Sequence, residues 1–448
     1  MTKFKHYTST LLTQTRMPMT TDMEICQKDY PLDWYQEDFI PYAEAYHALP
    51  DRKLTTIVEW MTPYMERARA HFGEKLLLLA HYYMGGEIVR LIEHFGGYVG
   101  DSYQLALMAA KHPEKSLIIE SAVHFMAESI SILAHDHQEV YITNPKAGCT
   151  MEMLAKDFMV EPAFIDLNER YGSENILPVC YMNTSGRLKA MTGAQGGTVC
   201  TSSNVKKIFQ WARQQKRKIL FIPDQHMGEN VAYWLGIKNL AYWPGGTAGA
   251  QYSLAAQDEA TLEQFDKAEL ILFSSECSVH TYYQPKMCEY WHEKGYTTIV
   301  HPECRNTVIQ LAHHAGSTSF VWDFVTQDKA GTKRYAIGTE NHLVENLKQY
   351  CKPLGIEVVN LAEIPTNDIE KGMGCGCATM SRNDPPHLVA LVDLLRQGKT
   401  LSYNKVEAGD AVNEFTGTRQ RLGKEDQQWV IANAKKALEM MIDITEKD

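Results

Sequence analysis

The chain has 448 residues, of which 44% are hydrophobic and 22% are charged, and its formal net charge is -11 at pH 7. This length exceeds what one hydrophobic core supports and predicts about three domains. The acidic balance argues against a nucleic-acid-binding protein, and no apolar run reaches the roughly 18 residues of a transmembrane helix. Ten cysteines without a secretion signal indicate a reducing compartment.

Residues 1–70 are expected to form a partly helical N-terminal extension. No Asp or Glu precedes Asp22, which is a weak feature of organellar transit peptides, although a disordered leader is the favoured interpretation. We therefore expect a cytoplasmic protein, with an organelle as the alternative compartment. Ile57, Met61 and Met65 recur at helical spacing, which predicts a helix that packs outside the core.

From Lys75 onward the sequence repeats one pattern three times, in which apolar strands alternate with helices. Each repeat ends at a cysteine, and these are Cys149, Cys277 and Cys377. Alternating strands and helices are typical of parallel sheets that are covered on both faces. The sequence thus predicts an α/β fold with three αβα three-layer-sandwich domains in a pseudo-threefold arrangement around one central site.

The expected boundaries follow the repeats. Domain 1 covers 71–170, domain 2 covers 171–290 with an insertion near 246–276, domain 3 covers 291–385, and C-terminal helices occupy 386–448.

The three repeat-ending cysteines follow predicted strands or lie in a glycine-rich stretch, where α/β proteins place their chemistry. Cys277 follows the apolar run 270–273, Cys149 follows 140–143, and Cys377 lies in 372–380. Three thiolates from three domains suit a [4Fe–4S] cluster with one open iron that acts as a Lewis acid. By themselves, three loop cysteines could equally be inert. Of the other cysteines, four are expected to be buried structural thiols, namely Cys26, Cys180, Cys288 and Cys351.

A dozen short motifs occur in a fixed order between about Lys75 and Leu395, and through them the chain closely resembles the quinolinate synthase family. They are A-H-Y-Y (80–83), G-D-S (100–102), V-H-F-M-A-E (123–128), A-G-C (147–149), Y-M-N-T-S (181–185), C-T-S-S-N (200–204), P-D-Q-H-M-G (223–228), C-S-V-H (277–280), H-P-E-C (301–304), G-S-T-S (316–319), T-E (339–340) and C-A-T-M (377–380).

The resemblance implies three αβα domains around a [4Fe–4S] cluster, held by Cys149, Cys277 and Cys377. It implies a reaction in which iminoaspartate condenses with dihydroxyacetone phosphate, with loss of phosphate and water, to give quinolinate for NAD biosynthesis. An L-aspartate oxidase or dehydrogenase would supply the iminoaspartate.

The resemblance also implies roles for individual residues. Acid–base and proton-transfer roles are expected for Tyr83, His280, His301 and Glu303. Substrate binding is expected for His81, Ser102, Tyr181, Asn183, Ser202, Ser317 and Thr318. Hydroxyl groups at helix starts commonly serve only as N-caps, but a helix N-terminus that faces a pocket also binds anions.

Three readings compete with this one. The first is another Fe–S hydro-lyase that acts on a hydroxy acid. The second is an Fe–S redox sensor in which Cys375 and Cys377 switch by oxidation, and the third is a sugar-phosphate-binding domain with inert thiols. The chain also departs from the family pattern in its longer N-terminal extension, in 246–276, and at Ala378, where proline is common.

Overall fold

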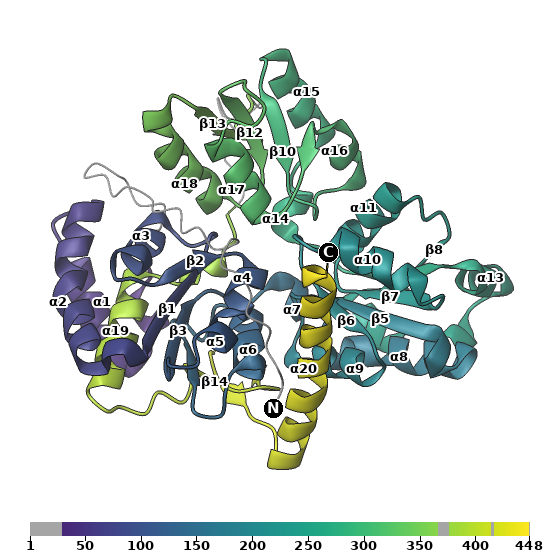
Figure 1. The fold of residues 1–448 in the computed structure, drawn as a ribbon, viewed down its shortest axis with the longest axis horizontal. Helices are drawn as coiled ribbons and strands as arrows, with labels where there is room; N and C mark the ends of the chain where they lie inside the picture. Colours follow the sequence, from purple (N-terminus) through teal and green to yellow (C-terminus); the bar gives the residue numbers. More distant parts are fainter. Residues whose placement is uncertain (1–28, 366–375, 414–415, 448) are drawn as a thin grey trace.

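The computed structural model describes residues 29–365, 376–413 and 416–447. The predicted leader, Cys26 and Cys375 fall outside the described residues. Three sheets with helices on their faces make up most of the chain (Figure 1), as the α/β prediction required. Every helix in the described ranges is too short or too polar to cross a membrane.

The first sheet contains four parallel strands and one antiparallel edge strand, in the order β14-β4-β3-β1-β2. Its strands are β1 (Leu76–His81), β2 (Tyr98–Gly100), β3 (Leu117–Ser121), β4 (Glu139–Ile142) and β14 (Lys405–Val406). The helices of this part are α3 (Gly86–His94), α4 (Ser102–Ala106), α5 (Met108–Lys111), α6 (His124–Leu133) and α7 (Thr150–Leu154). The strands are buried apolar runs, which a parallel sheet covered on both faces requires.

The second sheet is wholly parallel, in the order β6-β5-β7-β9-β8. Its strands are β5 (Ile176–Tyr181), β6 (Thr198–Cys200), β7 (Lys218–Ile222), β8 (Leu240–Pro244) and β9 (Leu270–Ser274). The helices are α8 (Asp157–Tyr171), α9 (Gly186–Ala194), α10 (Val205–Gln214), α11 (Gln225–Leu235), α12 (Gly246–Gln251), α13 (Glu259–Lys267) and α14 (Ser278–Thr281). The segment 246–276 thus holds two helices and the interior strand β9.

The third sheet is also parallel, in the order β11-β10-β12-β13. Its strands are β10 (Thr297–Val300), β11 (His314–Ala315), β12 (Arg334–Gly338) and β13 (Glu357–Asn360). The helices are α15 (Pro285–Glu293), α16 (Asn306–Leu311), α17 (Thr318–Thr326) and α18 (Asn341–Cys351). In all three sheets the first strand lies between the second and the third.

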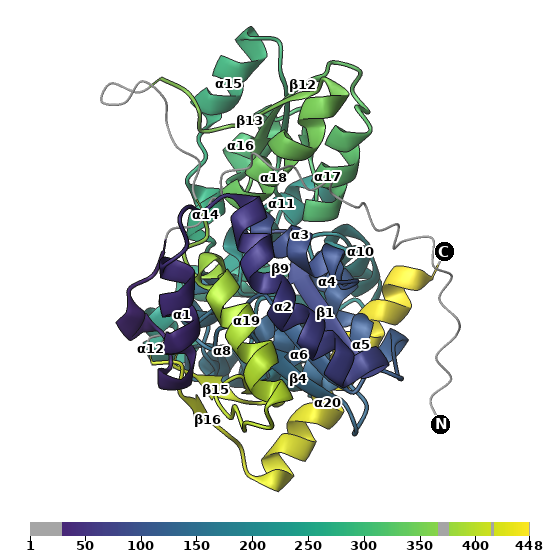
Figure 2. The same cartoon turned by 90° about the vertical axis from the view of Figure 1, so that its left-hand side faces the viewer.

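The N-terminal helices do not pack outside the core, so that expectation is wrong. Helix α1 (Ile40–His47) and helix α2 (Leu54–Phe72) pack against α19 (Pro385–Arg396), as Figure 2 shows. Ile57, Met61 and Met65 are fully or almost fully buried and join the hydrophobic cluster of the first sheet. Their helical spacing buries one face of α2 because α19 supplies a matching apolar surface.

The C-terminal region connects the first two sheets. Strand β14 extends the first sheet, and a short hairpin follows, formed by β15 (Ala411–Val412) and β16 (Arg419–Gln420). Helix α20 (Lys424–Glu446) then packs along α9 and β6 of the second sheet. A Cβ atom on Gly193 would lie 2.0 Å from the backbone oxygen of Asn433, so glycine permits this close approach of α9 and α20.

Candidate functional site

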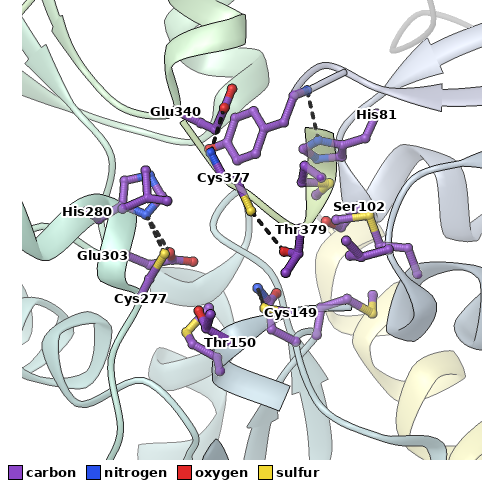
Figure 3. A pocket seen from close by; sticks show the side chains of 18 of the residues that line it. His81, Ser102, Cys149, Thr150, Cys277, His280, Glu303, Glu340, Cys377 and Thr379 are labelled. Atoms are coloured by element: carbon purple, nitrogen blue, oxygen red, sulfur yellow. Dashed lines mark hydrogen bonds and ion pairs between the residues drawn. The ribbon is translucent and has the colours of Figure 1, made fainter. Parts of the chain in front are cut away.

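A cavity of about 290 Å³ lies where the carboxyl ends of the three sheets meet (Figure 3). Thirteen of the fourteen predicted site residues line it. They are His81, Tyr83, Ser102, Cys149, Tyr181, Asn183, Ser202, Cys277, His280, His301, Glu303, Thr318 and Cys377. Residues that are far apart in sequence meet here because the loops after parallel strands share one edge of each sheet.

The three predicted cysteine ligands come from three different segments. Cys149 follows β4 and precedes α7, Cys277 follows β9 and precedes α14, and Cys377 stands before a short 3-10 turn at Met380–Arg382. All three thiols are free and partly exposed to the cavity. By contrast, Cys180, Cys288 and Cys351 are buried, as expected for structural thiols.

Burial raises the pKa of all three cavity thiols. For Cys277, the negative charges of Glu303, Cys149 and Cys377 raise the pKa further. Three thiolates could share this cavity only if a strong positive charge stabilised them, and iron in a cluster supplies such charge.

The spacing of the three sulfur atoms bears on what they could hold. Ligand sulfurs of one metal ion, at about 2.3 Å each, lie within about 4.6 Å of one another. The Sγ atoms of Cys149, Cys277 and Cys377 are not all within 4.8 Å of one another. The arrangement therefore does not suit a single ion bound by all three thiols.

Glu303 lies at the centre of a buried polar group. Its Oε2 is 2.7 Å from Nδ1 of His280 and 3.9 Å from Nδ1 of His301, and the two imidazole rings stack with centroids 4.4 Å apart. Burial by itself would raise the pKa of Glu303, but the two histidines and a hydrogen bond from Tyr181 hold this pKa well below its usual range. Burial lowers the pKa of His301 to about 3. The site therefore presents an ionised carboxylate beside a neutral imidazole.

A second hydrogen-bonded group joins the first and third sheets. The hydroxyl of Tyr83 lies 3.0 Å from Oγ1 of Thr339 and accepts a hydrogen bond from Thr318 at 3.2 Å. Thr339 Oγ1 also lies 3.1 Å from Nε2 of His280. Burial lowers the pKa of His81 to about 3 and raises the pKa of Tyr83 well above its ordinary value. A neutral imidazole and a neutral phenol can both donate hydrogen bonds to an anionic substrate.

The hydroxyl residues at the helix starts divide into two kinds. Ser102 and Thr318 are the first residues of α4 and α17, and Ser202 precedes α10 by three positions; all three line the cavity. Ser317 is the N-cap of α17, where its side chain accepts a hydrogen bond from the Phe320 N–H at 3.2 Å, and it does not line the cavity. For Ser317 the structure supports only the capping role.

Several cavity residues were not predicted from the sequence, and Glu340 is one of them. Its Oε1 accepts hydrogen bonds from the Cys377 N–H at 2.9 Å and from Nδ1 of His342 at 2.7 Å, while Oε2 accepts from the His342 N–H at 2.7 Å. Asp101 was missed as well, although it, and not Ser102, caps α4. A carboxylate directly before a predicted helix is a capping signal that could have identified both residues.

Comparisons with known proteins agree on one family. The family model described as Quinolinate synthetase A protein (NadA) matches residues 65–414. Quinolinate synthase of Geobacillus kaustophilus (strain HTA426) is 36% identical over 385 residues, which cover 84% of this chain and 92% of that protein. Quinolinate synthase of Acidobacterium capsulatum is 36% identical over 367 residues, which cover 81% of this chain and 90% of that protein. The matched range contains every cavity residue named above.

Proposed function

Because this chain belongs to the NadA quinolinate synthetase family, we propose that it condenses iminoaspartate with dihydroxyacetone phosphate to form quinolinate for NAD biosynthesis. The atoms balance when one phosphate and two water molecules leave. The reaction joins the three-carbon skeleton of dihydroxyacetone phosphate to iminoaspartate through one C–C bond and one C–N bond. We therefore class the activity as a transferase. The observation that carries the proposal is the convergence of three cysteines, three histidines and Glu303 on one cavity.

The proposed architecture is three αβα domains in a pseudo-threefold arrangement around this cavity. The domains would cover 71–170, 171–290 and 291–385, flanked by the extension 1–70 and the helices of 386–448. The order of the first three strands, which all three sheets share, and the convergence of the three cysteine segments on one cavity support it.

Cys149, Cys277 and Cys377 would hold a [4Fe–4S] cluster, one per chain. When bound, the cluster supplies a Lewis-acidic iron that weakens a C–O bond of the substrate without net redox change. The chain has a direct means of orienting the thiolates. The amide of Asn183 lies 3.7 Å from Sγ of Cys149, and Nδ1 of His280 lies 3.2 Å from Sγ of Cys277.

Substrate anions would be bound by neutral donors, which explains how an acidic protein holds them. Ser202 and Thr318 stand at the N-terminal ends of α10 and α17, where free N–H groups and the helix dipole favour phosphate or carboxylate. His81, Tyr181 and Asn183 would complete the contacts, together with Ser102. Ser317 keeps its predicted substrate role only indirectly, because its hydroxyl caps the helix that presents Thr318.

Proton transfer would be carried by the group around Glu303. An ionised carboxylate can remove the proton whose loss precedes each dehydration, and His280 can return a proton to the departing oxygen. His301, which is neutral at physiological pH, would hold the carboxylate of Glu303 in place. Tyr83 would transfer a proton to or from the substrate at the opposite wall of the cavity. Each of these groups lies in a buried cavity, where excluding water protects the imine from hydrolysis.

The substrate iminoaspartate is labile, so an L-aspartate oxidase or dehydrogenase would have to supply it nearby. We propose that both enzymes act in the cytoplasm, with an organelle as the alternative compartment.

A direct assay separates this function from that of a hydro-lyase that acts on a hydroxy acid. Anaerobic protein would be given dihydroxyacetone phosphate and enzymatically generated iminoaspartate, and in parallel a series of simple hydroxy acids. Quinolinate formation that requires both substrates supports the proposal. Turnover of a hydroxy acid without quinolinate formation contradicts it, and the absence of any turnover favours the redox sensor.

A further inference from the structure

The N-terminal segment 30–39 lies outside the range that the family model matches, yet it contacts the segment that follows Cys377. The hydroxyl of Tyr30 donates to the backbone oxygen of Ser381 at 2.8 Å. The hydroxyl of Tyr35 donates to Oδ2 of Asp384 at 2.5 Å. Two tyrosines of the extension are therefore bonded to residues that stand four and seven positions after a cavity cysteine.

The same segment also contacts the Cys149 loop. Nζ of Lys146, three residues before Cys149, donates to the backbone oxygen of Trp34 at 3.0 Å. The ring of Trp34 stacks on the ring of Tyr30, with centroids 5.2 Å apart. The segment 30–39 thus bonds to both cysteine segments at once.

Beneath this segment, the two cysteine segments are bonded to each other. The amide of Asn144 donates to the backbone oxygen of Arg382 at 2.7 Å, and Nη1 of Arg382 donates to the backbone oxygen of Lys146 at 2.5 Å. Deeper in the protein, the hydroxyl of Thr143 donates to Oδ1 of Asn383. Asn383 also donates from Nδ2 to the backbone oxygen of Met380 at 3.1 Å, and Met380 lines the cavity.

The segment 30–39 is itself firmly anchored. Phe39 is completely buried and Tyr35 is 6% exposed. The ring of Tyr35 stacks on His387 of α19, with centroids 4.6 Å apart. Because a buried, stacked ring has few alternative rotamers, its hydroxyl is held in place at little further entropic cost.

We propose that residues 30–39 clamp the Cys149 and Cys377 segments together from outside the cavity and so restrain these two thiols for cluster binding. The clamp leaves the Cys277 segment free, since none of the hydrogen bonds described above reaches it. The inference rests on the proposed function only in assigning the cluster to these thiols; the restraint itself is a property of the protein chain.

The test compares three full-length proteins: wild type, the double variant Tyr30→Phe/Tyr35→Phe, and the control Tyr42→Phe. The double variant removes the two clamping hydroxyls and keeps both rings. The control removes a hydroxyl that donates to Asp393 of α19 at 2.8 Å, away from both cysteine segments. Iron-free protein is treated with N-ethylmaleimide, and the labelling rate of each cysteine is measured by peptide mass spectrometry.

In the double variant, Cys377 should label about tenfold faster than in wild type, because the two lost hydrogen bonds, each of ordinary net strength, hold the segment that follows it. Cys149 should label faster as well, because its segment is bonded to Arg382 of the loosened segment. Cys277 and every cysteine of the control should label at the wild-type rate. Unchanged labelling of Cys149 and Cys377 would overturn the clamp, as would equal acceleration at Cys277 or in the control.

A second readout uses protein that has been loaded anaerobically with iron and sulfide. Iron release to a chelator should be about tenfold faster in the double variant than in wild type and in the control. Equal release rates would overturn the link between the clamp and the cluster. Because the labelling experiment needs neither a cluster nor turnover, a failure of the proposed function would leave its result intact.

Discussion

Replacing Glu303 with Gln tests the centre of the proposed acid–base group, because it removes the negative charge and keeps the shape. The carboxylate is 3% exposed and lies 2.7 Å from Nδ1 of His280. A positioned acid–base group contributes about 10²–10⁴-fold to rate, so kcat for quinolinate formation should fall by about that factor. The KM values should change much less, because the substrate-binding hydroxyls and amides remain.

The same substitution should change acid stability in a defined direction. The pKa of Glu303 is held below its usual value, so its contribution to stability is fully present above about pH 4.5 and is lost as the pH falls through the lowered pKa. Replacing a buried carboxylate that accepts hydrogen bonds from His280 and Tyr181 with a neutral amide weakens these bonds and costs roughly 1–3 kcal/mol at neutral pH. Glu303→Gln should therefore lower the free energy of unfolding at pH 7 and flatten its decline between pH 5 and pH 3.

The assays are anaerobic quinolinate formation and urea unfolding at several pH values. Glu229→Gln is the matched control, because Glu229 pairs with His226 at 3.2 Å outside the cavity. Its activity should stay within about twofold of wild type. A Glu303→Gln protein with at least half of the wild-type kcat would refute the acid–base role, and an unchanged acid profile would refute the lowered pKa of Glu303.

Three further substitutions test the cluster, the polar network and the C-terminal packing. Cys277→Ala should abolish quinolinate formation and lower the iron content; full activity would exclude Cys277 as a ligand. Thr339→Val removes the hydroxyl that contacts the Tyr83 hydroxyl and Nε2 of His280 in this buried network, and it should destabilise the protein by about 1–3 kcal/mol in urea unfolding; an unchanged stability would contradict this role of the hydroxyl. Gly193→Val should cost about 1–3 kcal/mol by overpacking against α20; a stability equal to that of the wild type would contradict the close packing.

Much of the fold was predictable because it depends on local pattern. The first two sheets open with largely apolar runs, such as 76–80, that no exposed strand would carry. The turns that follow contain the hydroxyl or carboxylate residues of helix starts. The order of the first three strands is the same in all three sheets because the same local units recur. The grouping of His81, Tyr181 and Cys277 was predictable since they stand at strand ends, where a parallel sheet gathers its side chains. The roles expected of them came from the resemblance to the family.

What the sequence did not reveal depends on contacts between distant segments. Nothing near Lys405 indicates that β14 adds to the first sheet, because its partner β4 lies more than 250 positions earlier. The burial of Ile57 depends on α19, which is equally remote. Glu340 was missed as a cavity residue because its bond to the Cys377 N–H crosses 37 positions.

The most direct test of the account is the iron and sulfide content, with the visible absorption, of full-length protein purified without oxygen. The account predicts about four irons and four sulfides per chain and a broad absorption band that bleaches in air. Protein that stays colourless and free of iron after anaerobic reconstitution would contradict the claim that Cys149, Cys277 and Cys377 together hold a cluster.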